Sequence, residues 1–334
     1  MTRAFVTGST GLLGSNLVRQ LVDEGYEVQA LARTKEKADR FLGDVDTQIV
    51  IGDMLDIPAF TPSLVGVDVL FHVAAFFKEY TGADDKYDKL LQTINVDGTI
   101  ALFEAAKAQG VRNIVYTSSG GVIGQSANGA AADETSPFNE ATPNQYFQSK
   151  IRAEKAIEGW LKDNPDMRVV LILPGAILGP GDNGPTGIGR MCIDVLEGNL
   201  PATPPGALMM VDVRDVATAS IKAIKQGNSG DRFIVANRFC TMSELVPLVA
   251  KVGGVKAPAF NLPYPVAWMY GAGSELVAKI TGQPPLATRV LIKTLNEDIQ
   301  LSSAKAQREL GITYHPIEET VSDAITWFRD FGYV

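Results

Sequence analysis

A tyrosine and a lysine spaced four residues apart have the clearest potential for chemistry in this chain. Tyr146 and Lys150 lie near the start of residues 145–162, whose apolar pattern predicts a helix. This spacing places both side chains on one helical face. A nearby ammonium lowers the pKa of a tyrosine, so Tyr146 is predicted to give a proton to a carbonyl oxygen, or to take one in the reverse direction. The alternative is a surface pair of no catalytic importance.

Hydroxyl groups stand at the end of the strand that is predicted just before this helix. Thr117, Ser118 and Ser119 follow the apolar residues of this strand, which spans residues 113–118. A hydroxyl at this place can bond a substrate oxygen and stabilise a developing alkoxide. Together with Tyr146, these residues indicate acid–base chemistry on a carbonyl that receives hydride.

A glycine-rich loop near the N-terminus predicts a dinucleotide-binding site. The loop follows a strand predicted at Arg3–Thr7 and opens a helix predicted over residues 12–24. Its glycine spacing allows a tight turn and close approach of the backbone to a pyrophosphate, and the helix N-terminus favours phosphate. The predicted cofactor contacts are Gly8, Thr10, Gly11, Leu12, Leu13 and Gly14. An ordinary βα turn that needs glycines is the alternative.

The end of the second predicted strand favours NADP as the cofactor. NAD binding usually places an Asp or Glu about 20 residues beyond the glycines. Residues 31–35 contain no acid, whereas Arg33, with Lys37 nearby, can bond a 2′-phosphate. NAD stays possible, because these cations also fit a solvated loop. After the third predicted strand, Asp53 and Met54 are predicted to contact the adenine, although Asp53 could instead cap a helix.

The first half of the chain alternates apolar strands with amphipathic helices, which is typical of a parallel, doubly wound α/β sheet of the Rossmann type. Strands are predicted at residues 3–7, 27–32, 47–51, 67–73, 113–118 and 168–173. Helices are predicted at residues 12–24, 35–42, 90–109 and 145–162. Ligands of such sheets bind at the carboxyl ends of the strands, where the candidate residues above are expected to meet.

The pattern changes after Pro174. Residues 174–189 are rich in Gly and Pro and predict a loop, while residues 209–235 predict further βαβ structure. From residue 241 the pattern is mostly helical. We therefore predict a dinucleotide-binding domain and a smaller, mostly helical C-terminal substrate lobe. The domain comprises residues 1–182, 206–236 and 298–334, and the lobe comprises residues 183–205 and 237–297.

The composition argues against several classes of protein. The 334 residues include 30 Lys and Arg against 38 Asp and Glu, and the net charge of −8 disfavours nucleic acid and anionic membranes as partners. The apolar stretches are too short to span a membrane. Two cysteines predict a cytoplasmic protein, and two histidines argue against a metal site. His72 lies inside a predicted strand and is expected to be a buried neutral imidazole.

Several motifs together resemble the extended short-chain dehydrogenases/reductases of the NAD-dependent epimerase/dehydratase type, and within them the dihydroflavonol-reductase-like branch. The motifs are residues 7–14, 52–53, 72–75, 95–99, 118–119, 174–175 and 211–215, together with Tyr146 and Lys150. The resemblance implies that Ser119 is the catalytic serine, with Ser118 as the alternative. It further implies that Tyr146 is the acid or base, that Lys150 bonds the nicotinamide ribose, and that Asn95 is a fourth catalytic member.

The same resemblance implies further contacts and an assembly. The additional cofactor contacts are Val73, Ala74, Ala75, Thr117, Tyr146, Lys150, Pro174, Ala176 and Ile177. Family members often dimerise through the helices that correspond to residues 90–109 and 145–162, so a homodimer is possible.

Residues after the fourth predicted strand and in the lobe are predicted to form an apolar substrate pocket. The predicted substrate contacts are Phe76, Phe77, Tyr80, Val122, Met191 and Tyr264. This set suits a small or hydrophobic carbonyl compound, although each residue singly also fits the protein core. Nucleotide-sugar enzymes of the family often have basic residues in the lobe, and here residues 183–205 contain only Arg190.

Three functions follow from these observations. The first is an NADP(H)-dependent reductase of an aldehyde or ketone, in which Tyr146 exchanges the proton and Ser119 holds the oxygen. The second is an NAD-dependent nucleotide-sugar epimerase or dehydratase, which reduces and reoxidises its cofactor within one turnover. The third is a non-catalytic protein that senses the cofactor, and the complete set of Ser119, Tyr146 and Lys150 argues against it.

Overall fold

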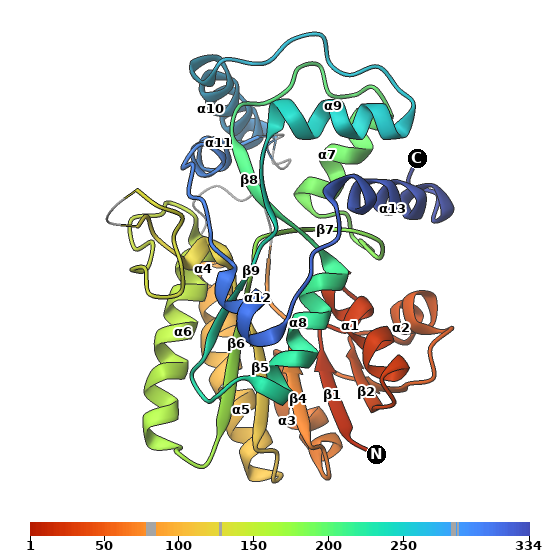
Figure 1. The fold of residues 1–334 in the computed structure, drawn as a ribbon, viewed down its shortest axis with the longest axis vertical. Helices are drawn as coiled ribbons and strands as arrows, with labels where there is room; N and C mark the ends of the chain where they lie inside the picture. The colour runs from red at the N-terminus through yellow and green to blue at the C-terminus, as the bar shows by residue number, and fades with distance from the viewer. Residues whose placement is uncertain (78–84, 127–128, 282–284, 286) are drawn as a thin grey trace.

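Seven parallel strands form the central sheet of the computed structural model, which describes residues 1–77, 85–126, 129–281, 285 and 287–334. The strands are β1 (Arg3–Thr7), β2 (Glu27–Ala32), β3 (Gln48–Ile51), β4 (Val69–His72), β5 (Asn113–Thr117), β6 (Arg168–Pro174) and β9 (Arg232–Val235). Their order is β3-β2-β1-β4-β5-β6-β9, so the direction of strand progression reverses between β1 and β4 (Figure 1). Ligands of doubly wound sheets bind at this reversal point.

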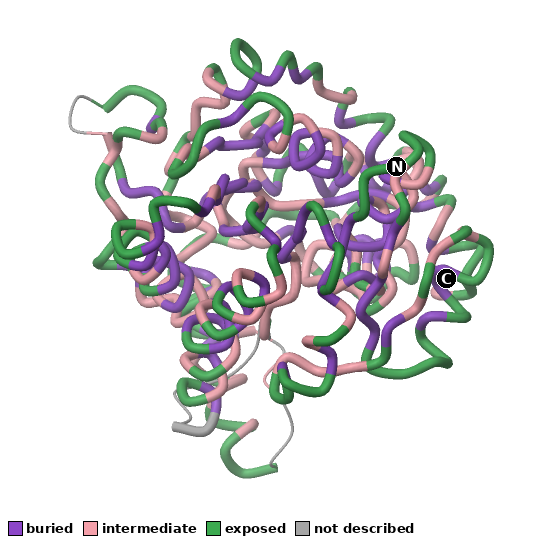
Figure 2. The backbone as a smooth tube through the Cα atoms, turned by 90° about the horizontal axis from the view of Figure 1, so that it is seen from below, coloured by how far each residue is buried: buried purple, intermediate pink, exposed green. Residues whose placement is uncertain are grey.

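Helices cover both faces of the sheet. One set comprises α1 (Leu12–Asp23), α2 (Lys35–Leu42), α8 (Val213–Gln226) and α12 (Ala304–Leu310), and the other α3 (Ile57–Phe60), α5 (Gly98–Ala108) and α6 (Gln145–Asp163). Ala4 and Val6 of β1 pack with the first set, and Phe5 packs with the second. Both faces are therefore buried, and Figure 2 shows that the buried segments of the chain gather in the interior. This burial is the reason that the strands are apolar throughout, and it confirms the predicted Rossmann-type fold.

The helix predicted over residues 90–109 is not continuous. α4 (Asp85–Leu90) leads into a π-helical segment, η2 (Leu91–Asp97), and only then does α5 begin. The N–H of Gly98 donates to the carbonyl oxygen of Thr93, five residues earlier, instead of four. Apolar periodicity did not predict this wider turn, because it changes the spacing over only a few residues.

A second, three-stranded sheet lies where the sequence predicted a loop and further βαβ structure. Its strands are β7 (Ala176–Leu178), β8 (Ala207–Asp212) and β10 (Arg238–Thr241). β8 is central, parallel to β7 and antiparallel to β10. The predicted loop over residues 174–189 is therefore wrong in part, and β8 does not join the main sheet. Both errors arise because pairing between distant segments decides these strands.

The lobe lies on the carboxyl-terminal side of the central strands (Figure 1). Its helices are α7 (Gly187–Leu196), α9 (Met242–Gly253), α10 (Tyr264–Thr281) and α11 (Arg289–Leu295). α13 (Ile317–Asp330), which we assigned from the sequence to the dinucleotide-binding domain, packs Val321, Ile325 and Phe328 into the core that α7 and α9 share. Among the residues described, none of the helices has the length and apolarity required to cross a membrane.

Candidate active site

The glycine loop brings the first βα unit into close contact with the end of β4. Gly8 has a φ of 68°, and a Cβ at this position would lie 2.8 Å from the backbone nitrogen of Ala74. A Cβ on Gly14 would lie 2.1 Å from the carbonyl oxygen of Gly8. Only glycine fits at these two positions. Gly11 precedes α1 without a side-chain cap, so the N–H groups of the first helical turn can face phosphate oxygens.

A cavity of about 1890 Å³ opens beside this loop and extends under the lobe. Of the predicted cofactor residues, all except Lys150 line it. They are Gly8, Thr10, Gly11, Leu12, Leu13, Gly14, Arg33, Asp53, Met54, Val73, Ala74, Ala75, Thr117, Tyr146, Pro174, Ala176 and Ile177. Because a Cβ would fill the glycine cradle and the N-terminus of α1 has no side-chain cap, these residues fit a dinucleotide.

Two cations line the cavity just beyond β2. Arg33 and Lys37 are exposed and, within the described part of the chain, neither forms an ion pair. The neighbouring Lys35, in contrast, pairs with Asp39 at 2.7 Å and does not line the cavity. Asp53 lines the same region, and its Oδ1 accepts the backbone N–H two residues later at 2.9 Å. Arg33 and Lys37 are therefore the side chains here that can receive an anion.

Tyr146 and Lys150 share one face of α6, with the Lys150 Nζ lying 5.9 Å from the centre of the Tyr146 ring. This Nζ donates to the carbonyl oxygen of Thr117 at 2.7 Å and to the hydroxyl of Tyr116 at 3.2 Å. Burial lowers the pKa of Lys150 to about 7. Burial, assisted by Tyr87, raises the pKa of Tyr146. The Tyr146 pKa therefore moves in the direction opposite to the one predicted from the spacing to Lys150, because desolvation of the buried phenol is the largest effect on it.

The two serines after β5 have different partners. The hydroxyl of Ser118 donates to the buried carboxylate of Glu154. The Oγ of Ser119 accepts the N–H of Gly121 at 3.2 Å, which leaves its own proton for donation. Both residues line the cavity. Ser119 is therefore the serine whose O–H is available to a substrate oxygen.

Asn95 lies in η2, is buried and does not line the cavity. Its Oδ1 accepts the N–H of Phe76 at 2.7 Å. Its Nδ2 donates to the carbonyl oxygen of Phe76 and to the hydroxyl of Ser149, each at 3.0 Å. Asn95 thus positions the segment after β4 against α6. In this structure it has no direct access to a reacting atom.

His72 is buried and connects the glycine loop to η2. Thr7 Oγ1 accepts the N–H groups of the two residues after β4, so its hydroxyl donates to His72 Nδ1 at 2.8 Å. The proton of His72 therefore lies on Nε2 and is donated to Thr99 at 3.0 Å, and Thr99 donates in turn to the carbonyl oxygen of Asn95. Burial lowers the pKa of His72 to about 3. The structure therefore agrees with a neutral, structural imidazole.

Three of the predicted substrate residues line the cavity: Phe76, Phe77 and Met191. Phe77 is 46% exposed, and its ring meets that of Tyr146 edge-on, with 4.6 Å between ring centres. Phe76 packs against the ring of Tyr87 at 5.4 Å. The segment after β4 therefore covers the candidate acid with aromatic surface.

The other predicted substrate residues are placed elsewhere. Val122 is the last residue of the short helix η3 (Gly120–Val122) and is fully buried in the core, so it cannot contact a ligand. Tyr264 begins α10 and does not line the cavity, and Tyr80 lies outside the described residues. Strand β8 and the lobe instead supply residues that sequence patterns did not indicate, because they meet only in the fold. They include Leu208, Phe239, Leu262, Val266, Tyr270 and Leu291.

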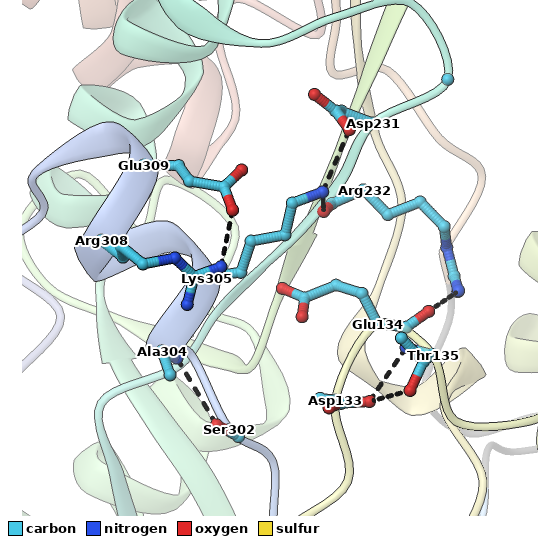
Figure 3. A pocket seen from close by; sticks show the side chains of 11 residues that line it. Asp133, Glu134, Thr135, Asp231, Arg232, Ser302, Ala304, Lys305, Arg308 and Glu309 are labelled. Carbon is cyan, nitrogen blue, oxygen red and sulfur yellow. Dashed lines mark hydrogen bonds and ion pairs between the residues drawn. The ribbon is translucent and has the colours of Figure 1, made fainter.

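A second pocket, of about 420 Å³, lies at the edge of the central sheet beside β9 (Figure 3). The cations among its described residues are all paired. Lys305 pairs with Asp231 at 3.1 Å, and Arg308 pairs with its neighbour Glu309 at 2.6 Å. Arg232 Nε lies 2.9 Å from the buried Glu154 of α6. This balance of charge favours a structural role for the pocket, so the large cavity is the candidate active site.

Comparison with known proteins identifies the family of the chain. Residues 4–236 match the NAD dependent epimerase/dehydratase family. The chain is 32% identical over 336 residues to a putative dihydroflavonol 4-reductase of Synechocystis sp., with 99% of the chain and 95% of that protein covered. It is 30% identical over 333 residues to sterol demethylase protein B of Methylococcus capsulatus, with 98% of the chain and 99% of that protein covered.

A solved structure shows the same fold over the whole length. The crystal structure of gox2253 has a TM-score of 0.84 and 32% sequence identity, and the match covers 99% of each chain. The relatives found by sequence similarity include proteins named as reductases and dehydrogenases. The chain therefore belongs to the NAD-dependent epimerase/dehydratase family of extended short-chain dehydrogenases/reductases, and it is an NAD(P)-dependent oxidoreductase.

Proposed function

We propose that this protein reduces an aldehyde or ketone with NADPH, and that it oxidises the alcohol in the reverse direction. The strongest support for this proposal is that one cavity is lined by the glycine loop, the cations Arg33 and Lys37, and the residues Ser119 and Tyr146 with their hydroxyl groups. Such a cavity provides a cofactor site and a carbonyl site in one continuous space.

The side chains divide the chemistry among them. A bound nicotinamide supplies the hydride for the carbonyl carbon. Ser119 donates a hydrogen bond to the carbonyl oxygen and stabilises the negative charge that develops there. Tyr146 is protonated at neutral pH, because its pKa is raised, and transfers its phenolic proton to the same oxygen. The ammonium of Lys150, beside the Tyr146 ring, then stabilises the phenolate that is left.

The cations beyond β2 support NADP as the preferred cofactor. Arg33 and Lys37 line the cavity without ion-pair partners in the described part of the chain. Residues 31–35 offer no carboxylate for the ribose 2′-hydroxyl that NAD presents. A 2′-phosphate would give both cations a charge-assisted partner.

The rest of the cavity supports a hydrophobic carbonyl substrate. Aromatic and aliphatic side chains from the segment after β4 and from the lobe line it. Of the three lobe cations that line the cavity among the described residues, two are already paired with acids, Arg190 with Asp194 at 2.8 Å and Arg289 with Glu275 at 2.7 Å, and the third is the exposed Lys279. A diphosphate would have to compete with these acids for the two arginines. One relative is named sterol demethylase protein B, and this name also supports a hydrophobic substrate.

A nucleotide-sugar epimerase or dehydratase is the second candidate, and the family description favours it. Such an enzyme needs the same glycine loop, Ser119, Tyr146 and Lys150. It differs in that the cofactor is reduced and reoxidised within one turnover. Net consumption of NADPH therefore separates the two candidates.

The test is a screen of aliphatic, aromatic and polycyclic aldehydes and ketones for NADPH oxidation, followed by Tyr146→Phe. Removal of the phenolic proton is expected to lower kcat about 10²- to 10⁴-fold, because that is the usual contribution of general acid catalysis. NADPH binding, measured by calorimetry, is expected to stay unchanged. Tyr26→Phe, at a tyrosine that contacts Lys225 on the other side of the sheet, is the control and should keep full activity.

Two results would contradict the proposal. Turnover of wild-type magnitude in Tyr146→Phe would exclude the proposed acid. Conversion of a nucleotide sugar without net NADPH oxidation, with no carbonyl reduced, would assign the protein to the second candidate.

A further inference from the structure

We propose that Glu154 is a positioning residue of this site, which keeps Lys150 in its ammonium form and turns the Ser118 hydroxyl away from the substrate. The inference rests on the proposed function, in which Lys150 acts on Tyr146. Glu154 does not line the cavity, so it would act only through these neighbours.

The geometry places a buried carboxylate one turn beyond Lys150 on the same face of α6. Glu154 is 4% exposed. Its Oε1 accepts the hydroxyl of Ser118, and its Oε2 lies 2.9 Å from Arg232 Nε. The second contact lacks hydrogen-bond geometry and is an ion pair. Glu154 therefore connects the strand end that bears the serines with the helix that bears Tyr146 and Lys150.

Arg232 reaches Glu154 from outside the catalytic region. It begins β9 at the sheet edge, where Figure 3 shows it beside the second pocket. Its Nη1 donates to the carbonyl oxygen of Glu134 at 3.0 Å, and its guanidinium lies over the ring of Phe138 at 5.0 Å. Arg232 is thus held on two sides. Burial raises the pKa of the Glu154 carboxyl, whereas Arg232, the Ser118 hydroxyl and Lys150 oppose this rise, so a guanidinium in a fixed position favours the carboxylate form.

Glu154 is important for the protonation state of Lys150, because the other titratable groups around that side chain are neutral. Burial disfavours the Lys150 ammonium and lowers its pKa to about 7, even though Glu154 opposes this effect. The other titratable groups that face Lys150 are His72 from β4, Tyr116 from β5 and Tyr146 from α6. Burial keeps these three neutral at neutral pH. Glu154 is therefore the anion, among the described residues, that compensates the buried ammonium.

The same contact explains why Ser119 and Ser118 differ. Ser118 uses its proton on the Glu154 carboxylate. If Glu154 were absent, the Ser118 hydroxyl would be free to turn and compete for the substrate oxygen, since this residue also lines the cavity.

The test is Glu154→Gln, which keeps an oxygen for Ser118 but removes the charge. Loss of a buried neighbouring anion is expected to move the alkaline limb of the pH profile of kcat/KM for reduction down by about one pH unit. Glu154→Asp, which keeps the charge, is expected to restore the limb toward its wild-type position. Glu158→Gln is the matched control, because Glu158 lies one turn further along α6, is exposed and pairs with Lys162. This control should leave the limb in place.

A second measurement needs no turnover. The affinity for NADPH, measured by calorimetry across the same pH range, should decline on the alkaline side as Lys150 loses its proton, and it should decline at lower pH in Glu154→Gln. Lys150→Met should remove this pH dependence. If Glu154→Gln does not fold, the double variant Glu154→Met with Arg232→Met removes the ion pair without leaving an unpaired charge and should move both profiles in the same direction.

The outcomes separate the two proposals. Profiles of Glu154→Gln that coincide with those of the wild type, or an equal shift in Glu158→Gln, would overturn the role of Glu154. If the wild type reduces no carbonyl compound, the proposed function fails, while the NADPH-binding profile still decides whether Glu154 controls Lys150.

Discussion

Neighbouring side chains in this site differ in role because they have different partners. Ser118 and Ser119 are identical in type, yet Ser118 is bonded to Glu154 while Ser119 keeps its proton. Beyond β2, Lys35 is paired with Asp39, while Arg33 lines the cavity without an acid among the described residues. Residue type and spacing identified these candidates. They did not identify the partner of each side chain, because that partner is distant in the sequence or is reached only in one orientation of the side chain.

Arg33 provides the test of cofactor choice at this scale. Arg33→Gln is expected to weaken NADPH binding about 10- to 100-fold, because one hydrogen bond to a charged group contributes roughly 1.5–3 kcal/mol. NADH, which lacks the 2′-phosphate, should bind almost as before. Lys35→Gln removes a charge two residues away, at a side chain that does not line the cavity, and should change neither affinity. Calorimetry measures all four constants. Equal weakening of both cofactors by Arg33→Gln would contradict the preference for NADP.

Two local sequence patterns, the spacing along α6 and the glycine loop, determine much of how the elements form this site. α6 presents Tyr146, Lys150 and Glu154 at successive turns, and this regular spacing is visible in the sequence. The glycine loop is visible as well, because only glycine fits between β1, α1 and the end of β4. The π-helical η2 is not visible, although it places Asn95 against Phe76 and Ser149. Its wider turn is stabilised by these contacts, and no residue pattern marks it.

The glycine loop can be tested as an element. Gly8 and Gly25 both have positive φ, 68° and 82°, but a Cβ on Gly25 would have no neighbour within 4 Å. Alanine at either position should cost roughly 1–2 kcal/mol of unfolding free energy through backbone strain. Gly8→Ala should cost more, since its Cβ would meet Ala74, and should weaken NADPH binding by about tenfold or more. Denaturant unfolding and calorimetry measure the two effects. If Gly25→Ala also lost affinity for NADPH, backbone strain alone would explain the weaker binding in Gly8→Ala.

At the scale of the whole molecule, a firmly packed central sheet contrasts with one weakly packed helix of the lobe, α10. The central strands are buried on both faces (Figure 2). In α10, by contrast, only Ala267 and Gly271 are buried among the residues described, and Ile280 is 78% exposed. α10 nevertheless lines the cavity through Val266 and Tyr270. This part of the cavity wall therefore has little apolar burial to hold it in place.

Hydrogen exchange should detect this difference. The backbone amides of α10 are expected to exchange much faster than those of α6, because few buried contacts resist local opening. NADPH alone should protect the glycine loop and leave α10 unchanged, whereas NADPH with a carbonyl substrate should protect α10 too. Protection of α10 as strong as that of α6 in the free protein would contradict this description of the lobe.

Local sequence patterns predict the Rossmann-type sheet, the dinucleotide loop, the tyrosine–lysine pair and the basic end of β2. These features depend on local periodicity, backbone sterics and short spacings, which can be seen along the chain. Contacts across the fold, in contrast, place Val122 in the core, join β7, β8 and β10 into a second sheet, and bring Arg232 to Glu154. Each of these depends on contacts between distant segments, whose burial and desolvation no local pattern specifies.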